Sequence, residues 1–524
     1  MSGIARLLRM MARRDRMLLP LWIVAATVMP WGTYTSYTSL YSTEADRASL
    51  ATSMDGAGGL MLLYGPPGDL TTAAGFTEWR IGSFLAILLG IFAILTIMRH
   101  TRAEEESGRA ELLAAGALGR HASLTAALIL VCGATLVAGL LAGAGLVVAG
   151  APSGGSMVFG LTVGLFGCVC AGIAAIAAQL VSYARTANGI ALAVLGVMFL
   201  LRGWGDAASI PFLSWTSPLG WVTRVQAFGD ARWWVLALLF ILSVLVTGCA
   251  YALAARRDFG AGLVASGEGP ARGRISSPWA LAWRLQRGAL AAWALAFAVF
   301  GLVLGSLTSA ITDMVGDSSK VKDMFEQLGG SGDTIALQYV ATIVSILAVI
   351  AAFYGVQAAL HTRVEEAEGR VEVVLATSVS RSTWLASHLV IAFVGSAALV
   401  VLGTFAACAT ASRSLDNLSF GDIVAAALVQ LPALWVMVGL SAALVGLIPR
   451  LSPLSWLAAA AVVVIMMFGP LLGLSDALLD VSPFQHVPKL PGGEISAMPL
   501  LILAAVATVL TGVGFLGFRR RNVG

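Results

Sequence analysis

Long apolar runs, separated by short polar segments, make up most of the chain. Many of these runs reach the ~20 residues that an α-helix needs to cross a bilayer, and they lack the alternation of barrel strands. The pattern predicts an all-α polytopic membrane protein with about 12 transmembrane helices. The expected spans cover residues 17–38, 81–99, 122–149, 157–181, 188–201, 234–255, 289–310, 337–359, 384–408, 423–447, 454–473 and 498–517.

A charged segment that follows the second expected span is repeated after the eighth. Block 1 reads His100-Thr-Arg-Ala-Glu-Glu-Glu-Ser-Gly-Arg-Ala-Glu111. Block 2 reads His361-Thr-Arg-Val-Glu-Glu-Ala-Glu-Gly-Arg-Val-Glu372, and eight of the twelve positions are identical. The repeat indicates a duplicated membrane module with a cytosolic working element in each copy.

Shorter matches flank the two blocks at nearly the same spacing. Gly68-Asp69 corresponds to Gly332-Asp333, Ser217-Pro218 to Ser482-Pro483, and Arg257 to Arg521. Because each repeat has an even number of spans, both have one orientation and are related by an axis along the membrane normal. We expect an N-terminal six-span repeat at 1–260, a cytosolic linker with an interfacial helix at 261–288, and a C-terminal six-span repeat at 289–524.

Basic, partly apolar segments precede the first span of each repeat. These are residues 4–16 and Trp279–Arg287. Their composition is typical of interfacial helices that lie on the membrane with arginines against anionic headgroups. Ordinary positively charged flanks of a span are the alternative.

Composition and charge predict the cellular location of the protein and its orientation in the membrane. The chain is 58% hydrophobic and 11% charged, against roughly 25% charged in a soluble domain. Of the 32 Lys and Arg residues, 23 lie on the side of the expected termini, so the positive-inside rule places both termini in the cytosol. An arginine bias with abundant Ala and Gly indicates a GC-rich bacterial genome. We expect a multi-pass protein of the bacterial plasma (inner) membrane.

Catalytic and metal-binding patterns are missing from the sequence. It has no Gly-x-x-x-x-Gly-Lys-Ser/Thr phosphate loop, no zinc spacing, and no arrangement of a nucleophile with a base. All five cysteines fall inside expected spans, which argues against a disulfide framework. We expect no enzyme activity, no catalytic or metal site, no cofactor on this chain, and no nucleic-acid partner.

The blocks are the strongest candidates for a functional site. Glu105 and Arg109, like Glu366 and Arg370, have the i,i+4 spacing of an ion pair on one helix face. A glycine inside each block predicts two short helical pieces rather than one rod. The alternative is a solvated loop that only satisfies topology. The candidate partner-coupling residues are Glu104, Glu105, Arg109, Glu111, Glu365, Glu366, Arg370 and Glu372.

Charged residues are nearly absent from the expected spans, whereas ion-coupled carriers usually keep such groups in theirs. The spans instead hold aromatic, Met and amide side chains, which can line an adaptable greasy cavity. Packing and lipid contact are the alternative roles. The candidate cavity residues are Phe84, Phe92, Met198, Phe199, Phe353, Tyr354, Gln357, Met466, Met467 and Phe468.

The motif Glu-Glu-x-x-Gly-Arg-x-Glu, followed by Leu112-Leu113 and Arg120 or by Val373-Val374 and Arg381, resembles the coupling-helix region of type 2 ATP-binding-cassette (ABC) permeases. The single-chain, twelve-span form resembles actinobacterial permeases described as exporters of polyketide antibiotics, the tetronasin-resistance group. The segments that fit this group are Gly65-Pro-Pro-Gly-Asp-Leu-Thr-Thr72, Phe76-Thr-Glu-Trp-Arg80 and Ser217-Pro-Leu-Gly-Trp221.

The resemblance implies the permease subunit of an ATP-driven exporter of hydrophobic or amphipathic small molecules. A separate ABC ATPase, present in two copies, would bind ATP and Mg, and each block would contact one copy. The drug path would run between the second and fifth spans of each half, which are the second, fifth, eighth and eleventh spans of this chain.

Two other functions compete with this one. An ion-coupled twelve-span carrier of the major facilitator type also has a charged loop after its second span, which normally reads Gly-x-x-x-Asp-Arg-x-Gly-Arg-Arg. Block 1 is acidic and lacks both the Asp-Arg pair and the double arginine. A permease-like scaffold that senses a drug or lipid is the third possibility.

Overall fold

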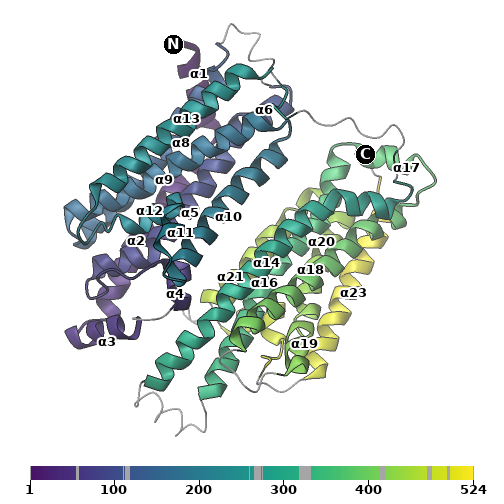
Figure 1. Ribbon diagram of the computed structural model, residues 1–524. Helices are drawn as coiled ribbons and strands as arrows, with labels where there is room; N and C mark the ends of the chain where they lie inside the picture. The colour runs from purple at the N-terminus through teal and green to yellow at the C-terminus, as the bar shows by residue number, and fades with distance from the viewer. Residues whose placement is uncertain are drawn as a thin grey trace. The chain divides into compact units, whose positions relative to one another are not determined.

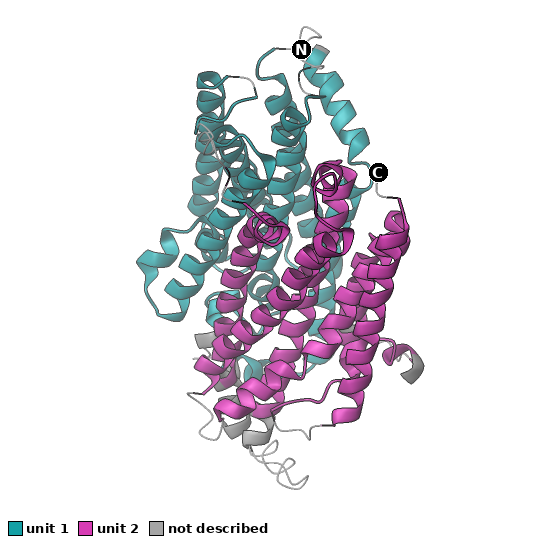
Figure 2. Ribbon diagram, turned by 90° about the vertical axis from the view of Figure 1, so that its right-hand side faces the viewer, with its two compact units in different colours: residues 1–268 teal, residues 269–524 magenta. Residues whose placement is uncertain are grey.

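The computed structural model divides between Glu268 and Gly269 into two compact units, called half 1 and half 2 (Figures 1 and 2). In the residues described, all regular secondary structure is helical. Those residues are 2–54, 58–109, 111, 119–258, 260–264, 273, 275–317, 332–412, 419–468, 475–491 and 496–522.

Ten helices or helix pairs in these residues are long and apolar enough to cross a membrane, and an eleventh joins them if the bent pair α1–α2 is one span. This establishes an all-α polytopic membrane protein. In half 1 the long helices are α2 (Leu18–Leu40), α5 (Ala73–His100), α8 (Ala122–Ala149), α9 (Ser153–Leu180), α10 (Ala184–Ala207) and α13 (Trp233–Arg256). In half 2 they are α14 (Pro278–Asp317), α16 (Gly332–Ala367), α18 (Arg381–Ala411), α19 (Phe420–Leu428) with α20 (Leu431–Leu447), and α23 (Ala497–Arg520).

The expected eleventh span, 454–473, accounts for the difference from twelve. Helix α21 (Leu454–Phe468) has 15 residues. At 1.5 Å per residue it is about 22 Å long, short of the ~30 Å hydrocarbon core. The remainder of the expected range lies outside the described residues.

The segment expected to lie on the membrane is helix α1 (Ser2–Arg14), which meets α2 at a bend of 70°. Leu7 and Met11, one turn apart, are buried against half 1, while the arginines of α1 are exposed. Its counterpart in half 2 differs. Residues Trp279–Arg287 form the first turns of α14 and continue into the span without a break.

Two of the close helix packings recur in the two halves, whereas the close packing of α8 on α9 is found in half 1. The first span packs on the third, as α2 on α8 and α14 on α18, and the fourth packs on the sixth, as α9 on α13 and α20 on α23. Small residues bring the backbones together, as is common between membrane helices. A Cβ added to Gly139 of α8 would lie 2.2 Å from the carbonyl oxygen of Gly160 in α9.

Short helices connect the spans. Those with Pro at their first or second position are α11, α12, η1 and η2, where the missing N–H of Pro costs no helical hydrogen bond. The connecting helices are α3 (Glu44–Met54), α4 (Gly58–Tyr64), α6 (Arg102–Glu106), α11 (Pro211–Trp215), α12 (Pro218–Arg224), α17 (Arg370–Leu375), η1 (Pro449–Leu451), α22 (Asp476–Leu479) and η2 (Pro483–His486).

Candidate functional site

Each block lies at the end of the second span of its half and breaks at its glycine. In block 1, α5 ends at His100 and α6 covers Arg102–Glu106 before Gly108, whose φ is +72°. In block 2, α16 continues to Ala367, and Gly369 with φ +71° precedes α17. Both glycines adopt the left-handed conformation that ends helices. Block 2 therefore shows the expected break into two helical pieces, whereas in block 1 most of the segment after Gly108 lies outside the described residues.

The expected i,i+4 ion pairs are wrong, because the left-handed glycine redirects the arginine that follows it. A terminal nitrogen of Arg109 lies 3.8 Å from a carboxylate oxygen of Glu104. In block 2, Arg370 donates hydrogen bonds of 2.7 and 2.8 Å to Glu365 and also pairs with Glu368. Hydrogen bonding to Glu365 raises the pKa of Arg370. In both copies the arginine thus pairs with the glutamate five residues before it, and in block 2 it pairs with Glu368 as well.

Glu105 and Glu366, the glutamates that were expected to pair within their blocks, instead bind an arginine that follows the sixth span of the same half. Arg257, which follows α13, donates from both terminal nitrogens to Glu105, and Nη1 lies 2.8 Å from the carboxylate. Arg521, which follows α23, does the same to Glu366, with Nη2 at 2.8 Å. These bidentate pairs are the strong form of a charge-assisted hydrogen bond. The sequence contained the signal, because Arg257 and Arg521 are matched positions of the repeat.

Two further arginines complete the cluster in each half. Arg120, before α8, donates to the carbonyl oxygen of Arg257 at 2.6 Å, and Arg381, at the start of α18, donates to that of Arg521 at 2.7 Å. Within the blocks, Arg102 pairs with Glu105 at 2.6 Å, and Arg363 pairs with Glu366 at 3.3 Å. The second, third and sixth spans of each half therefore meet at one point.

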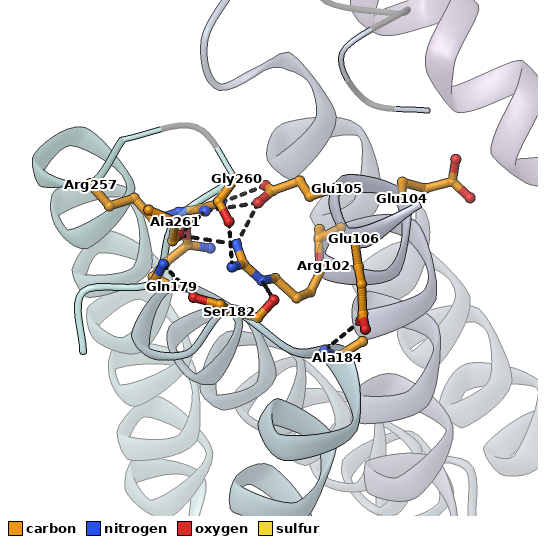
Figure 3. A network of polar contacts seen from close by, with 12 residues as sticks. Arg102, Glu104, Glu105, Glu106, Gln179, Ser182, Ala184, Arg257, Gly260 and Ala261 are labelled. Atoms are coloured by element: carbon orange, nitrogen blue, oxygen red, sulfur yellow. Dashed lines mark hydrogen bonds and ion pairs between the residues drawn. The ribbon is translucent and has the colours of Figure 1, made fainter. Parts of the chain in front are cut away.

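Arg102 is also buried beneath the segment that follows α13 (Figure 3). It donates to the carbonyl oxygens of Ser182 and Gly260, both at 2.9 Å, and of Ala261 at 3.1 Å. Figure 3 shows Glu105 pointing toward Arg257 and Arg102, whereas Glu104 points away from them. Residues 260–264 are thereby fastened to block 1.

The remaining block residues face outward or contact α1. Glu111 and Arg109 are exposed in block 1, as is Glu372 in block 2. Glu104 pairs with Arg14 of α1. Beside these residues lies a cavity of about 370 Å³, whose lining includes Arg14, Glu104 and His100. The buried carboxylate of Asp15 lies 2.5 Å from Nε2 of His100, which ties the bend between α1 and α2 to the end of α5.

The candidate cavity residues fall into two groups. Phe92 and Tyr354 are packed in the interiors of their halves, 4% and 1% exposed. Phe84 and Gln357 are exposed, and Gln357 accepts a hydrogen bond of 2.9 Å from the indole of Trp293. Partly buried side chains belong to Met198, Phe199, Phe353 and Met466. The side chains of Met467 and Phe468 lie outside the described part of the structure.

The fifth span carries charges that the sequence prediction missed. Helix α10 extends to Ala207, six residues beyond the expected end, and includes the buried residues Arg202 and Asp206. Arg202 donates to the carbonyl oxygen of Leu63 at 2.8 Å. Asp206 pairs with Arg224 of α12 at 3.0 Å. These contacts fasten the end of α10 to α4 and α12.

Comparison with known proteins gives concordant matches. The family described as "Multidrug efflux system permease Rv1217c, C-terminal domain" matches residues 6–254 and 275–519. The multidrug efflux system permease protein Rv1217c of Mycobacterium tuberculosis is 39% identical over 528 residues, an alignment that covers 100% of this chain and 95% of the relative.

Proposed function

The chain belongs to the multidrug efflux system permease family, and we propose that it is the membrane-spanning subunit of an exporter driven by a separate ABC ATPase. It is a transporter subunit rather than an enzyme. Its substrates in this proposal are hydrophobic or amphipathic small molecules. The narrower assignment to exporters of polyketide antibiotics rests on the motifs at Gly65–Thr72, Phe76–Arg80 and Ser217–Trp221.

The observation that carries the proposal is the duplicated Glu–Arg cluster. An ATPase that works as two copies needs one contact site per copy, and each half has one such cluster, built from Glu105 and Arg257 or from Glu366 and Arg521. The same four contacts occur in both halves, as expected if each half contacts one copy of the ATPase.

The cluster also supports a route for force. A displacement of block 1 by the ATPase is carried to α13 through the Glu105–Arg257 pair, and to α8 through Arg120. In half 2, the corresponding route runs from Glu366 to α23 and α18. Because each pair is bidentate and charge-assisted, it fixes the orientation of the two side chains as well as their separation. A movement of the block would therefore be passed on in both its direction and its size.

The blocks, both termini and the linker lie in the cytosol in this proposal, and the protein resides in the bacterial plasma membrane. The excess of Lys and Arg on that side supports this orientation. ATP and Mg are bound by the partner, since no phosphate-loop sequence occurs in the chain.

An ion-coupled carrier is the second candidate, and the charges in α10 favour it. Such carriers keep ionisable groups in their spans. Here Asp206 is matched by Arg224, and Arg202 lies 3.9 Å from the same carboxylate. Since the acid already has cationic partners, it is better suited to hold α10 in place than to bind a transported ion.

The decisive experiment is co-purification with an ATPase encoded beside this chain, followed by reconstitution into liposomes. We expect the pair to hydrolyse ATP faster when a hydrophobic drug is added, and the chain alone to hydrolyse none. Drug export by the chain alone, driven by a proton gradient without ATP, would establish the ion-coupled carrier instead.

A further inference from the structure

A second cavity, of about 270 Å³, lies in half 1 at the opposite end of α5 from block 1. The first turns of α5, the first half of α9 and helix α12 form its walls together with adjoining loops. Four of its lining residues are aromatic: Tyr64, Trp79, Phe159 and Phe228. Aromatic rings carry negative charge on their faces, so an enclosure of this kind attracts cations.

The charged residues that line the cavity are all acidic. They are Asp69 and Glu78. Glu78 accepts backbone hydrogen bonds from Ala227 at 2.6 Å and Phe228 at 3.1 Å, and Asp69 accepts one from Thr71 at 3.0 Å. These bonds fix the carboxylates in position. No Lys, Arg or His within the described residues makes an ion pair with either of them.

A buried hydroxyl in the same cavity has no partner among the residues that the structure describes. Ser83 of α5 is 2% exposed, and its Oγ makes no hydrogen bond with any described residue. A helical serine commonly donates to the carbonyl four residues earlier, as Thr77 and Thr162 nearby do. Buried polar groups without a partner are rare in folded proteins and require an explanation. A bound ligand with a polar group would provide one.

We propose that this cavity binds an organic cation, such as a substituted ammonium group attached to one aromatic ring. The carboxylates of Glu78 and Asp69 supply the counter-charge, and Ser83 offers a hydrogen bond. Trp79, Phe159 and Phe228 supply apolar and cation–π contact, whereas the Tyr64 ring already has the guanidinium of Arg80 over it, 5.3 Å from its centre. The volume is close to the lower end of the ~300–1,000 Å³ range of ligand pockets. The cavity therefore suits a small cation or the cationic end of a larger drug.

The matched helix of half 2 lacks three of these groups, although Asp69 has a counterpart in Asp333. With the offset of 261 residues between the blocks, Glu78, Trp79 and Ser83 correspond to Tyr339, Val340 and Val344. The acid, the indole and the hydroxyl are all replaced at once. The second span therefore keeps its block in both halves, whereas the cavity-lining residues of α5 are not repeated in α16. We assign the cation site to half 1.

That the cation is transported cargo rests on the proposed exporter function. On the proposed topology the cavity is at the outer end of half 1, where a cargo leaves. Binding itself depends on neither ATP nor the partner, and it is measured on the chain alone.

The test is equilibrium dialysis of radiolabelled phenyltrimethylammonium against the full chain in lipid nanodiscs. Benzenesulfonate, a ring of similar size with the opposite charge, is the matched ligand control. We expect the cation to bind and the anion not to bind. Glu78→Gln should weaken cation binding about tenfold or more, since it removes the charge but keeps one oxygen to accept a backbone N–H. Glu44→Gln, which removes an exposed acid of α3 outside the cavity, should leave binding unchanged.

Phe159→Leu is the second variant, because it removes a lining ring of α9 without touching the hydrogen bonds of Glu78. It should also weaken cation binding while leaving Glu78 in place. Equal binding of the cation and the anion, or unchanged cation affinity in both Glu78→Gln and Phe159→Leu, would overturn the proposal. Either result would leave drug-stimulated ATP hydrolysis with the partner intact, so the cavity and the exporter function fail separately.

Discussion

Glu105 in block 1 holds Arg257 at the end of the sixth span of half 1 through both oxygens of its carboxylate. The same relationship joins Glu366 and Arg521 in half 2. One contact between distant segments therefore occurs in both halves, duplicated together with the spans. This makes the pair, rather than the block alone, the unit that each half repeats.

The first prediction concerns the energy of this pair. Glu366 and Arg521 are largely buried, 5% and 16% exposed in their side chains. Glu366→Ala or Arg521→Ala should therefore each destabilise the protein by about 2–5 kcal/mol, because the partner charge is left unpaired. The double variant should lose less than the sum, with a coupling energy of about 1–3 kcal/mol. Thermal unfolding in nanodiscs measures the stability changes. Strictly additive losses would show that the two side chains do not interact.

The second prediction separates contact with the ATPase from internal structure. Glu111 and Glu372 are exposed, so reversing their charge should disturb only a partner. Glu111→Lys together with Glu372→Lys should reduce co-purification of the ATPase while the melting temperature stays unchanged. Glu44→Lys, at an exposed acid of α3, serves as the control. Full association of the double-lysine variant would show that the exposed acids of the blocks are not the docking surface.

The third prediction concerns orientation. Ser107 in block 1 and Ser42 between α2 and α3 are both exposed, at opposite ends of the helices of half 1. A membrane-impermeant maleimide added to intact cells should label Ser42→Cys and not Ser107→Cys, and lysis should expose the latter. Because Cys249 is exposed, its labelling in the parent chain has to be subtracted. Labelling of Ser107→Cys alone in intact cells would invert the proposed topology.

The fourth prediction divides the candidate cavity residues by burial. Tyr354 is packed against Gly395 and Trp293, so Tyr354→Ala should destabilise the protein by about 3–5 kcal/mol and reduce export of all drugs alike. Phe84 and Gln357 are exposed. Phe84→Ala and Gln357→Ala should leave expression unchanged but alter the ranking of exported drugs. Export profiles across a drug panel measure both effects, and a uniform change for Phe84→Ala would assign that residue to packing.

Helical class, span positions and the break in each block follow from local sequence. Apolar run length set the spans, and a glycine in a charged segment predicted where the helix ends. The i,i+4 pairing of Glu105 with Arg109 failed because that rule applies to an uninterrupted helix, and Gly108 interrupts it. The same glycine therefore explains one correct prediction and one wrong one.

Partners from elsewhere in the chain were beyond such reasoning. The matched positions of Arg257 and Arg521 were visible in the repeat, but nothing local indicated that they contact Glu105 and Glu366. The end of α10 was misjudged for a related reason. Arg202 lowers the hydropathy of the sequence, yet its contacts with the rest of half 1 satisfy the charge inside the fold. A hydropathy value describes the preference of a side chain for water or lipid, and it takes no account of the residues that surround the side chain in the fold.

The glycine contact between α8 and α9 limits how a transport cycle can proceed. At Gly139 and Gly160 the two backbones touch, with no side chain between them to change rotamer or slide. Separating them would open a void, and rotating either helix would drive another residue into the opposing chain. We therefore expect the third and fourth spans of half 1 to move together in a transport cycle, with any hinge elsewhere in the half.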